Sequence, residues 1–234
     1  MKILKTARAT IDAEALSLNK LSSSIDESFV QAVNCINNCK GKLLLVGIGK
    51  SGHIARKAAS TFSSTGTPSS YLHPSEASHG DLGMIHKDDI VIAISKSGES
   101  IELKDIISYC KLSDIYLISI TSDNTSSLAN ISNITLRLPI VEEACPLGLA
   151  PTSSTIMALA LTDALAVCAL LLKDFSKEKF LRYHPGGKLG QYFLKVKDIM
   201  KKDLPLVNLF SPLSESIIQM SKGRMGCVGI VDEF

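Results

Sequence analysis

Short apolar runs alternate with segments of helical spacing through the central part of the chain. Residues 90–94 read Ile-Val-Ile-Ala-Ile, which has the length and β-branched content of a buried parallel strand. The predicted strands are 43–46, 69–72, 90–94, 115–120 and 134–138, and the predicted helices between them are 51–65, 75–82, 100–112 and 125–131. This alternation predicts βαβ units, and so a mainly parallel sheet with helices on both faces.

Further helices flank this alternating region. They are predicted at 1–24, at 26–39 and, after a loop, at 153–173. The Pro-Gly-Gly segment at 185–187 interrupts the alternation of strands and helices, and the sequence pattern changes from about residue 196. We therefore expect two domains, 1–194 and 195–234.

Composition narrows the classes of function. Lys and Arg number 25 against 23 Asp and Glu, so no large excess of positive charge indicates a nucleic acid or an anionic membrane as partner. No apolar run approaches the ~20 residues that cross a bilayer. The basic N-terminus is not followed by the apolar core and cleavage site of a signal peptide. The cysteines are scattered and form no CxxC pair, so we expect a reduced, cytoplasmic protein without a structural zinc site.

A serine-rich turn directly follows the strand predicted at 90–94. Residues 95–100 read Ser-Lys-Ser-Gly-Glu-Ser and lead into the next helix. Backbone N–H groups and the positive end of the helix dipole converge at such a turn, which favours an anion. The hydroxyls of Ser95, Ser97 and Ser100 would donate to a phosphate. The alternative is an ordinary loop rich in small polar residues.

Residues 47–52 match the GxGxxG pattern after a strand, but both nucleotide-binding interpretations fail on spacing. A dinucleotide fold needs an acid at the end of the second strand, and the nearest acid, Glu76, lies beyond it. A Walker A loop needs a glycine where Leu44 stands. What remains is a tight glycine turn in which Ser51 is a candidate phosphate donor. Lys50 is either a cation for the site or a solvated loop lysine.

Three histidines, His73, His79 and His184, lie where their side chains could reach a ligand. His79 lies in a short polar segment, and His184 precedes Pro-Gly-Gly on a rigid turn. Either is a candidate acid or base, although a lone histidine is more often structural. His73 and His79 could together bind a divalent metal, but no third ligand has suitable spacing. We therefore expect no obligatory metal, with His73 as a candidate ligand of an adventitious or inhibitory ion.

Carboxylates stand at two further positions of interest. Glu99 and Glu102 lie in the first turn of the helix after the serine turn, where Glu99 suits the helix dipole and Glu102 could point either way. Glu142 and Glu143 precede an apolar loop that contains two prolines. Partial burial there would raise the pKa of a glutamate toward neutrality and make it a usable general base.

Taken in order, these segments resemble the sugar isomerase (SIS) domain of the D-arabinose 5-phosphate isomerases. The resemblance spans about 9–194, and its motifs are GIGKSGH at 47–53, GTPS at 66–69, HPSEASHGDLG at 73–83, SKSGES at 95–100, EEACPLGLAPTSST at 142–155 and HPGGKLG at 184–190. It implies a three-layer αβα sandwich with a five-stranded, mainly parallel sheet. It also implies a homotetramer with active sites shared between subunits.

The same resemblance implies an aldose–ketose isomerase that needs no cofactor. It would interconvert D-ribulose 5-phosphate and D-arabinose 5-phosphate through an enediol(ate), the first step toward the Kdo sugar of lipopolysaccharide. The implied catalytic residues are Lys50, His79, Glu102, Glu143 and His184, and the implied phosphate-binding residues are Gly49, Ser51, Gly66, Thr67, Ser95, Ser97 and Ser100. We favour Glu143 as the base acting between C1 and C2, with Glu102 as the second choice. The histidines would serve hydroxyl proton transfer or ring opening, and Lys50 would stabilise the oxyanion.

The chain departs from the family pattern at Lys96, where family members usually carry a neutral polar residue. The lysine adds a positive charge beside the expected phosphate site.

The C-terminal part, 195–234, resembles the start of a CBS repeat. Family members usually carry two such repeats, and this sequence covers only part of the first. A lone incomplete repeat cannot form a paired nucleotide cleft, so we expect no adenylate regulation from these residues.

Two alternatives remain open at this point. One is a regulator that binds a sugar phosphate without catalysis, although such regulators commonly carry a DNA-binding helical module and no basic recognition helix is evident here. The other is an isomerase of a different phosphosugar, because anchoring the phosphate does not set the number of carbons. The sequence also does not distinguish lipopolysaccharide, capsule or catabolic roles.

Overall fold

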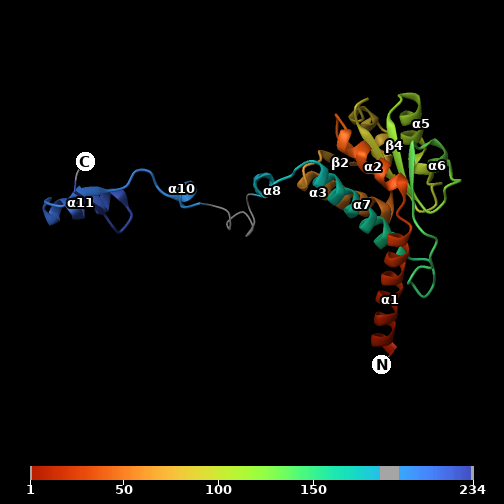
Figure 1. Ribbon diagram of the computed structural model, residues 1–234, viewed down its shortest axis with the longest axis horizontal. Coiled ribbons are helices and arrows are strands. Elements are labelled where there is room, and N and C mark those ends of the chain that lie inside the picture. Colours follow the sequence, from red (N-terminus) through yellow and green to blue (C-terminus); the bar gives the residue numbers. More distant parts are fainter. Residues whose placement is uncertain (1, 185–194, 233–234) are drawn as a thin grey trace. The chain divides into compact units, whose positions relative to one another are not determined.

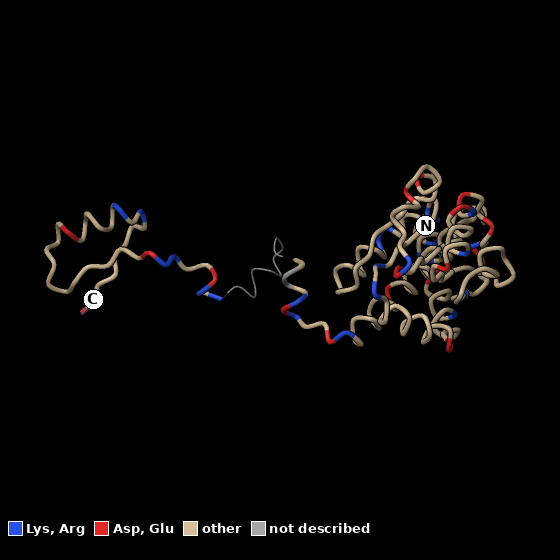
Figure 2. The backbone as a smooth tube through the Cα atoms, turned by 90° about the horizontal axis from the view of Figure 1, so that it is seen from above, with Lys and Arg blue, Asp and Glu red and all other residues tan. Residues whose placement is uncertain are grey.

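The computed structural model describes residues 2–184 and 195–232. The chain forms two compact units, Met1–Tyr183 and His184–Phe234, and each is described by itself. The predicted domain boundary at 194/195 borders residues outside the described ranges, so it stays a prediction. Basic and acidic residues are interspersed along both units (Figure 2).

The first unit is built on a five-stranded, fully parallel sheet with strand order β2-β1-β3-β4-β5 (Figure 1). The strands are β1 (Leu43–Val46), β2 (Ser69–Leu72), β3 (Ile90–Ile94), β4 (Tyr116–Thr121) and β5 (Ile134–Arg137). β1 pairs with β2 on one side and with β3 on the other, so the chain changes direction across the sheet at β1. Crevices that bind ligands form beside such a switch point, at the carboxyl ends of the strands.

Helices cover both faces of the sheet, which confirms the three-layer αβα sandwich (Figure 1). Leu43 and Leu45 of β1 face a core shared with α1 (Lys2–Ser23), α2 (Glu27–Asn38), α3 (Gly49–Ser64) and α7 (Ser153–Leu172). Leu44 and Val46 face the opposite core, which contains α4 (Pro74–Ala77), α5 (Lys104–Leu112) and α6 (Ser127–Ile131). Alternate residues of each strand therefore serve the two cores.

Two predicted helices are divided in the structure. The segment predicted at 75–82 forms α4, which ends at Ala77, and then the 3₁₀ helix η1 (Asp81–Met84), which Gly80 directly precedes with a φ of 124°. The segment predicted at 100–112 begins as the 3₁₀ helix η2 (Ile101–Leu103) and continues as α5. The strands predicted at 43–46, 69–72 and 90–94 are confirmed at both ends.

Helix α7 corrects the expectation that no apolar stretch is long enough to cross a bilayer. Over its 20 residues it has the length and hydropathy of a membrane span, with Asp163 as its interruption. Its buried face, which includes Met157, Leu161 and Leu165, belongs to the core that α7 shares with α1, α2 and α3. Asp163 also forms an ion pair with Lys57 of α3. These contacts are those of a core helix.

The remaining helix of the first unit is α8 (Lys177–Tyr183). The second unit contains α10 (Val196–Ile199), β6 (Leu206–Asn208), α11 (Leu213–Gly223) and β7 (Gly229–Val231). β6 and β7 pair in parallel around α11 as one βαβ unit. Its assignment to a CBS repeat stays a prediction.

Candidate functional site

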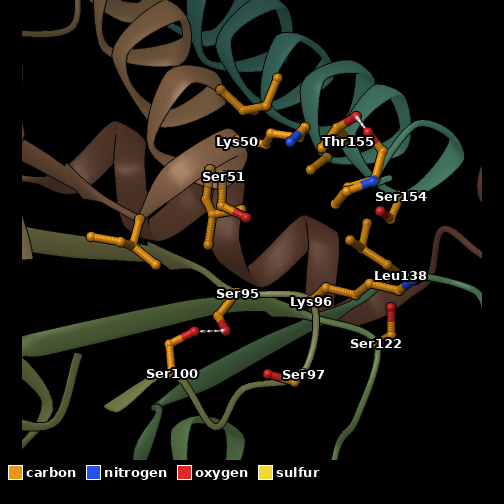
Figure 3. Close-up of a pocket in the computed structure, with 15 residues that line it drawn as sticks. Lys50, Ser51, Ser95, Lys96, Ser97, Ser100, Ser122, Leu138, Ser154 and Thr155 are labelled. Carbon is orange, nitrogen blue, oxygen red and sulfur yellow. Dashed lines mark hydrogen bonds between the residues drawn. The ribbon is translucent and has the colours of Figure 1, made fainter. Parts of the chain in front are cut away.

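A pocket of about 500 Å³ lies at the carboxyl ends of β1 and β3, beside the switch point of the sheet (Figure 3). Its polar lining consists of hydroxyl groups and two ammonium groups. The hydroxyls belong to Ser51, Ser95, Ser97, Ser100, Ser122, Ser154 and Thr155, and the ammonium groups to Lys50 and Lys96. A lining that donates many hydrogen bonds and carries two positive charges suits a small anionic ligand.

The serine turn after β3 forms one wall of the pocket. The Ser95 hydroxyl accepts a hydrogen bond from the Gly98 amide at 3.1 Å and lies 2.9 Å from the Ser100 hydroxyl. Gly98 has a φ of 69°, and a Cβ there would lie 2.0 Å from the Ser126 hydroxyl oxygen. Only glycine therefore fits the centre of this turn.

The first turn of α3 forms the opposite wall (Figure 3). Gly49 begins the helix with a φ of 56°, and Lys50 and Ser51 follow it into the pocket lining. The N-cap residue, Ile48, provides no side-chain hydrogen bond to this end of the helix. The positive end of the α3 dipole thus lies at the pocket.

The first turn of α7 completes the site and holds Glu143. One carboxylate oxygen of Glu143 accepts hydrogen bonds from the amides of Thr152 at 2.6 Å and Ser154 at 3.3 Å. The other accepts from the Lys96 ammonium at 2.6 Å. The Glu143 side chain is only 4% exposed, whereas that of Lys96 is 49% exposed. Glu143 therefore contacts two residues of the lining while being almost enclosed itself.

The charge state of Glu143 differs from the prediction. Burial by itself raises the pKa of this carboxyl, but the Lys96 ammonium and the donors of Thr152 and Ser154 outweigh burial and lower the pKa to about 2. The expectation of a pKa raised toward neutrality is therefore wrong for this arrangement. The reason is Lys96, a cation from a segment distant in sequence.

The pocket brings together most of the residues predicted to hold phosphate. Ser51, Ser95, Ser97 and Ser100 all line it, as does Lys50 of the predicted catalytic set, and Gly49 begins the helix that carries Lys50.

Gly66 and Thr67 are not part of this pocket, which corrects their predicted role within one chain. The Pro68 carbonyl accepts a hydrogen bond from the amide of Leu43, the first residue of β1, so this segment lies at the amino edge of the sheet, opposite the pocket. Thr67 is buried and accepts a hydrogen bond from the Lys173 ammonium at 3.0 Å. Gly66, with a φ of 91°, lies against the ring of Phe175. Both residues have structural contacts.

The other predicted catalytic residues lie outside the pocket lining. His79 is exposed in the turn after α4, which begins at the carboxyl end of β2, and Glu102 is exposed in η2. His184 is the first residue of the second unit, and the rest of its motif, 185–190, lies outside the described residues. Glu99, expected to complement its own helix, instead accepts hydrogen bonds from the amide and hydroxyl of Ser127 at the start of α6.

His73 has a structural contact of its own. It caps α4, its Nδ1 accepting a hydrogen bond from the Ser75 amide at 3.2 Å. Within 2–184 and 195–232, no three His, Cys, Asp or Glu side chains gather in a way that could hold a metal ion.

Three pocket hydroxyls were not predicted as ligand contacts. Ser122 directly follows the buried strand β4, and Ser154 and Thr155 lie in the first turn of α7. Small polar residues after a strand or at a helix start were the signal used for the serine turn, and the same signal identifies these three.

Comparisons with known proteins agree with this geometry. Residues 36–168, more than half of the chain, match the model of the SIS domain. The arabinose 5-phosphate isomerase KdsD of Francisella tularensis is 46% identical over 229 residues, which cover 95% of this chain and 70% of that protein. KdsD of Pseudomonas aeruginosa is 42% identical over 236 residues, covering 100% of this chain and 72% of its own length.

A solved structure supports membership of the same family. A protein of E. coli CFT073 in complex with arabinose 5-phosphate is 40% identical, with a TM-score of 0.76 over 79% of this chain and 98% of that one. On the strength of the domain match and of these relatives, the chain belongs to the SIS domain family and, within it, to the family of the arabinose 5-phosphate isomerases.

Proposed function

We propose that this protein is an aldose–ketose isomerase that interconverts D-ribulose 5-phosphate and D-arabinose 5-phosphate. The observation that carries the proposal is the pocket itself, which places an anion-binding turn beside an almost enclosed carboxylate. Relatives at 42–46% identity are named arabinose 5-phosphate isomerases, and a structural neighbour at 40% identity is described in complex with arabinose 5-phosphate.

The phosphate of the substrate binds between the serine turn and the first turn of α3. Ser97 and Ser100 on one wall and Ser51 on the other donate hydrogen bonds, and the α3 dipole adds a positive potential. Fixing the phosphate at one end of a five-carbon sugar leaves C1 and C2 to be positioned by the rest of the site.

Glu143 serves as the base that acts between C1 and C2. It removes a proton from C1 of the ketose, the C1–C2 double bond forms, and the carbonyl electrons move to O2. Return of the proton to C2, with transfer of the O1 proton to O2, gives the aldose without net loss of atoms or electrons. Glu143 is preferred to Glu102 because it contacts the lining residues Lys96 and Ser154, whereas Glu102 is exposed in η2.

The other groups have supporting roles in this proposal. Lys50 lines the pocket and stabilises the negative charge of the enediolate. His79 and His184 serve hydroxyl proton transfer or opening of a furanose ring. The reaction requires no redox cofactor and no metal.

A homotetramer with shared sites is part of the proposal. His79 and Glu102 lie outside the pocket that one chain forms, so a neighbouring subunit is a natural way to complete it. Helix α1 has 22 residues, of which only Ser17 and Leu21 are buried, and it exposes Leu4 and Ile11 one heptad apart. An apolar helix face of this kind is stabilised by packing against a second copy.

The direct test is incubation of the protein with D-ribulose 5-phosphate, followed by NMR of the sugar, with and without a chelator. The proposal predicts D-arabinose 5-phosphate in both samples. Binding of the sugar phosphate without any product would favour the regulator, and activity lost on chelation would show that a metal is required. Parallel incubations with D-fructose 6-phosphate and D-sedoheptulose 7-phosphate test whether the protein is an isomerase of a different phosphosugar.

The proposal extends to the cellular setting of the enzyme. The resemblance alone supports a cytoplasmic enzyme that supplies Kdo synthesis. Depletion of the protein in its host should then lower the cellular content of Kdo, and an unchanged content would assign the product to another use.

A further inference from the structure

We propose that Lys96 couples phosphate binding to the base, because a dianion bound in the serine turn draws the Lys96 ammonium away from Glu143 and frees the carboxylate. The substrate phosphate would then act as an activator as well as an anchor. This inference rests on the proposed function and deepens it.

Lys96 belongs to the serine turn and contacts Glu143, so it can interact with either the bound phosphate or the carboxylate. It stands between Ser95 and Ser97 in the turn, and all three residues line the pocket (Figure 3). Its ammonium lies 2.6 Å from Glu143 Oε1. The Lys96 side chain is half exposed on the pocket side, whereas Glu143 is almost fully enclosed. The ammonium can therefore turn toward the pocket without disturbing the core.

The backbone of the turn would stay in place during this movement. The Lys96 carbonyl accepts hydrogen bonds from the Ser122 amide at 2.9 Å and from the Thr121 hydroxyl at 3.1 Å. Only the flexible four-carbon side chain has to move, and lysine side chains change rotamer readily when exposed.

A bound phosphate competes effectively for this ammonium. Phosphate monoesters carry close to two negative charges at neutral pH, against one on Glu143. The serine turn would bring that charge next to Lys96, where Coulomb attraction at short range is strong. Glu143 would keep its orientation, because Oε2 still accepts from the Thr152 and Ser154 amides.

Loss of the ammonium changes the proton affinity of the carboxylate. Burial raises the pKa of Glu143, and the Lys96 hydrogen bond is the first of the interactions that oppose burial. When Lys96 turns away, the pKa rises from about 2, and Glu143 becomes a stronger base. The other groups that act on Glu143 are Thr152 and Ser154 at the first turn of α7, which continue to favour the carboxylate. Lys50 is the second ammonium of the pocket lining. Lys50 comes from α3 and is also expected to turn toward the phosphate.

The test follows the carboxyl of Glu143 directly by NMR, using protein labelled with ¹³C at the glutamate side-chain carboxyl. Sulfate serves as the probe because, unlike phosphate, it is still mainly a dianion one pH unit above the folded pKa of about 2, where the coupling places the raised midpoint. Chloride at equal ionic strength is the control for screening, and the Glu143→Gln variant assigns the signal. Amide signals of Ser97 and Gly98 report whether sulfate occupies the turn.

For the wild type, we expect sulfate but not chloride to raise the titration midpoint of Glu143 by about one pH unit or more, a tenfold change in proton affinity. In Lys96→Gln the midpoint should already be higher and should not respond to sulfate. Lys104→Gln, which removes a lysine near the turn, should behave like the wild type. A wild-type midpoint unmoved by bound sulfate, an unchanged midpoint in Lys96→Gln, or no binding of sulfate to the turn would each overturn the coupling.

Failure of this experiment is distinguishable from failure of the proposed function. Turnover of D-ribulose 5-phosphate with a midpoint insensitive to sulfate would leave the isomerase in place and remove the role of Lys96. A sulfate-dependent midpoint without turnover would retain the coupling and reject the isomerase.

Discussion

Glu143 and Lys96 are 47 positions apart in the sequence, yet their charged groups meet at 2.6 Å beside the pocket. The loop around Glu142 and Glu143 indicated a usable general base, and the family resemblance selected Glu143. The sequence did not identify the partner, because the encounter depends on how the end of β3 and the start of α7 are brought together. The predicted direction of the pKa shift of Glu143 was wrong for this reason. The sequence indicated burial of the carboxyl but not the cation that outweighs it.

The lowered pKa of Glu143 predicts a stability that depends on pH. The carboxyl has a pKa of about 2 in the folded chain against a model value of 4.5, so the folded state favours the carboxylate. Its contribution to stability is therefore complete above the unfolded value and is lost as the pH falls toward the folded value. We expect the free energy of unfolding to fall more steeply between about pH 6 and pH 3 in the wild type than in Glu143→Gln. Urea denaturation across that range measures both slopes, and equal slopes would contradict the ion pair.

Gly98 is the residue on which the serine turn depends most. Gly98→Ala places a Cβ 2.0 Å from the Ser126 hydroxyl at a φ of 69°. We expect a loss of stability of about 1–3 kcal/mol together with weaker binding of the sugar phosphate. Gly83→Ala is the matched control, because no other atom lies within 4 Å of a Cβ there. Thermal denaturation compares the two, and a Gly98→Ala variant as stable as Gly83→Ala would show that the turn is built differently.

At the scale of elements, the rule that parallel sheets bind ligands at the carboxyl ends of their strands explains which of the assigned residues line the pocket and which do not. Ser95, Ser97 and Ser100 follow β3, and Lys50 and Ser51 follow β1, so the sequence order placed them correctly. Residues 66–68 precede β2 and lie at the opposite edge of the sheet. Gly66 and Thr67 were assigned to the site by resemblance, and the position of their segment before the strand places them away from the pocket of the same chain.

The serine turn should act mainly through binding. Ser97→Ala and Ser100→Ala remove donors that hold the phosphate in ground and transition states alike. We expect each variant to raise KM for D-ribulose 5-phosphate about tenfold while kcat changes far less. Ser113→Ala, an exposed serine at the end of α5, is the control. Steady-state kinetics separate the two constants, and a defect confined to kcat would contradict phosphate anchoring.

The whole molecule consists of a sheet domain, which the alternation of strands and helices predicted well, and a smaller βαβ unit. What the sequence pattern could not supply is what each long helix packs against. Helix α7 has the composition of a membrane span and proves to be a core helix, whereas α1 is amphipathic and leaves its apolar positions largely uncovered. In both cases the arrangement of neighbouring helices decides which apolar side chains are covered.

The uncovered apolar positions of α1 predict self-association. Leu4 is 66% and Ile11 64% exposed. If a second copy covers these side chains, the double variant Leu4→Lys, Ile11→Lys should lose that contact. We expect light scattering to give the mass of a tetramer for the wild type and a smaller assembly for the double variant. Leu112→Lys, at an exposed apolar position on α5, should leave the mass unchanged. A monomeric wild type would contradict the tetramer, and an unaltered double variant would assign the contact to another surface.

The proposed role of Glu143, next to an anion-binding turn, is to interconvert a ketose and an aldose phosphate. Its most direct test is an NMR time course of D-ribulose 5-phosphate with the wild type, Glu143→Gln and Glu142→Gln at equal concentrations. Glu142 is the matched control because it is the adjacent, exposed glutamate. We predict D-arabinose 5-phosphate from the wild type and Glu142→Gln, and at least a roughly hundredfold slower formation by Glu143→Gln, in the range expected for loss of a general base. No product from the wild type, or product from Glu143→Gln at the wild-type rate, would contradict the account.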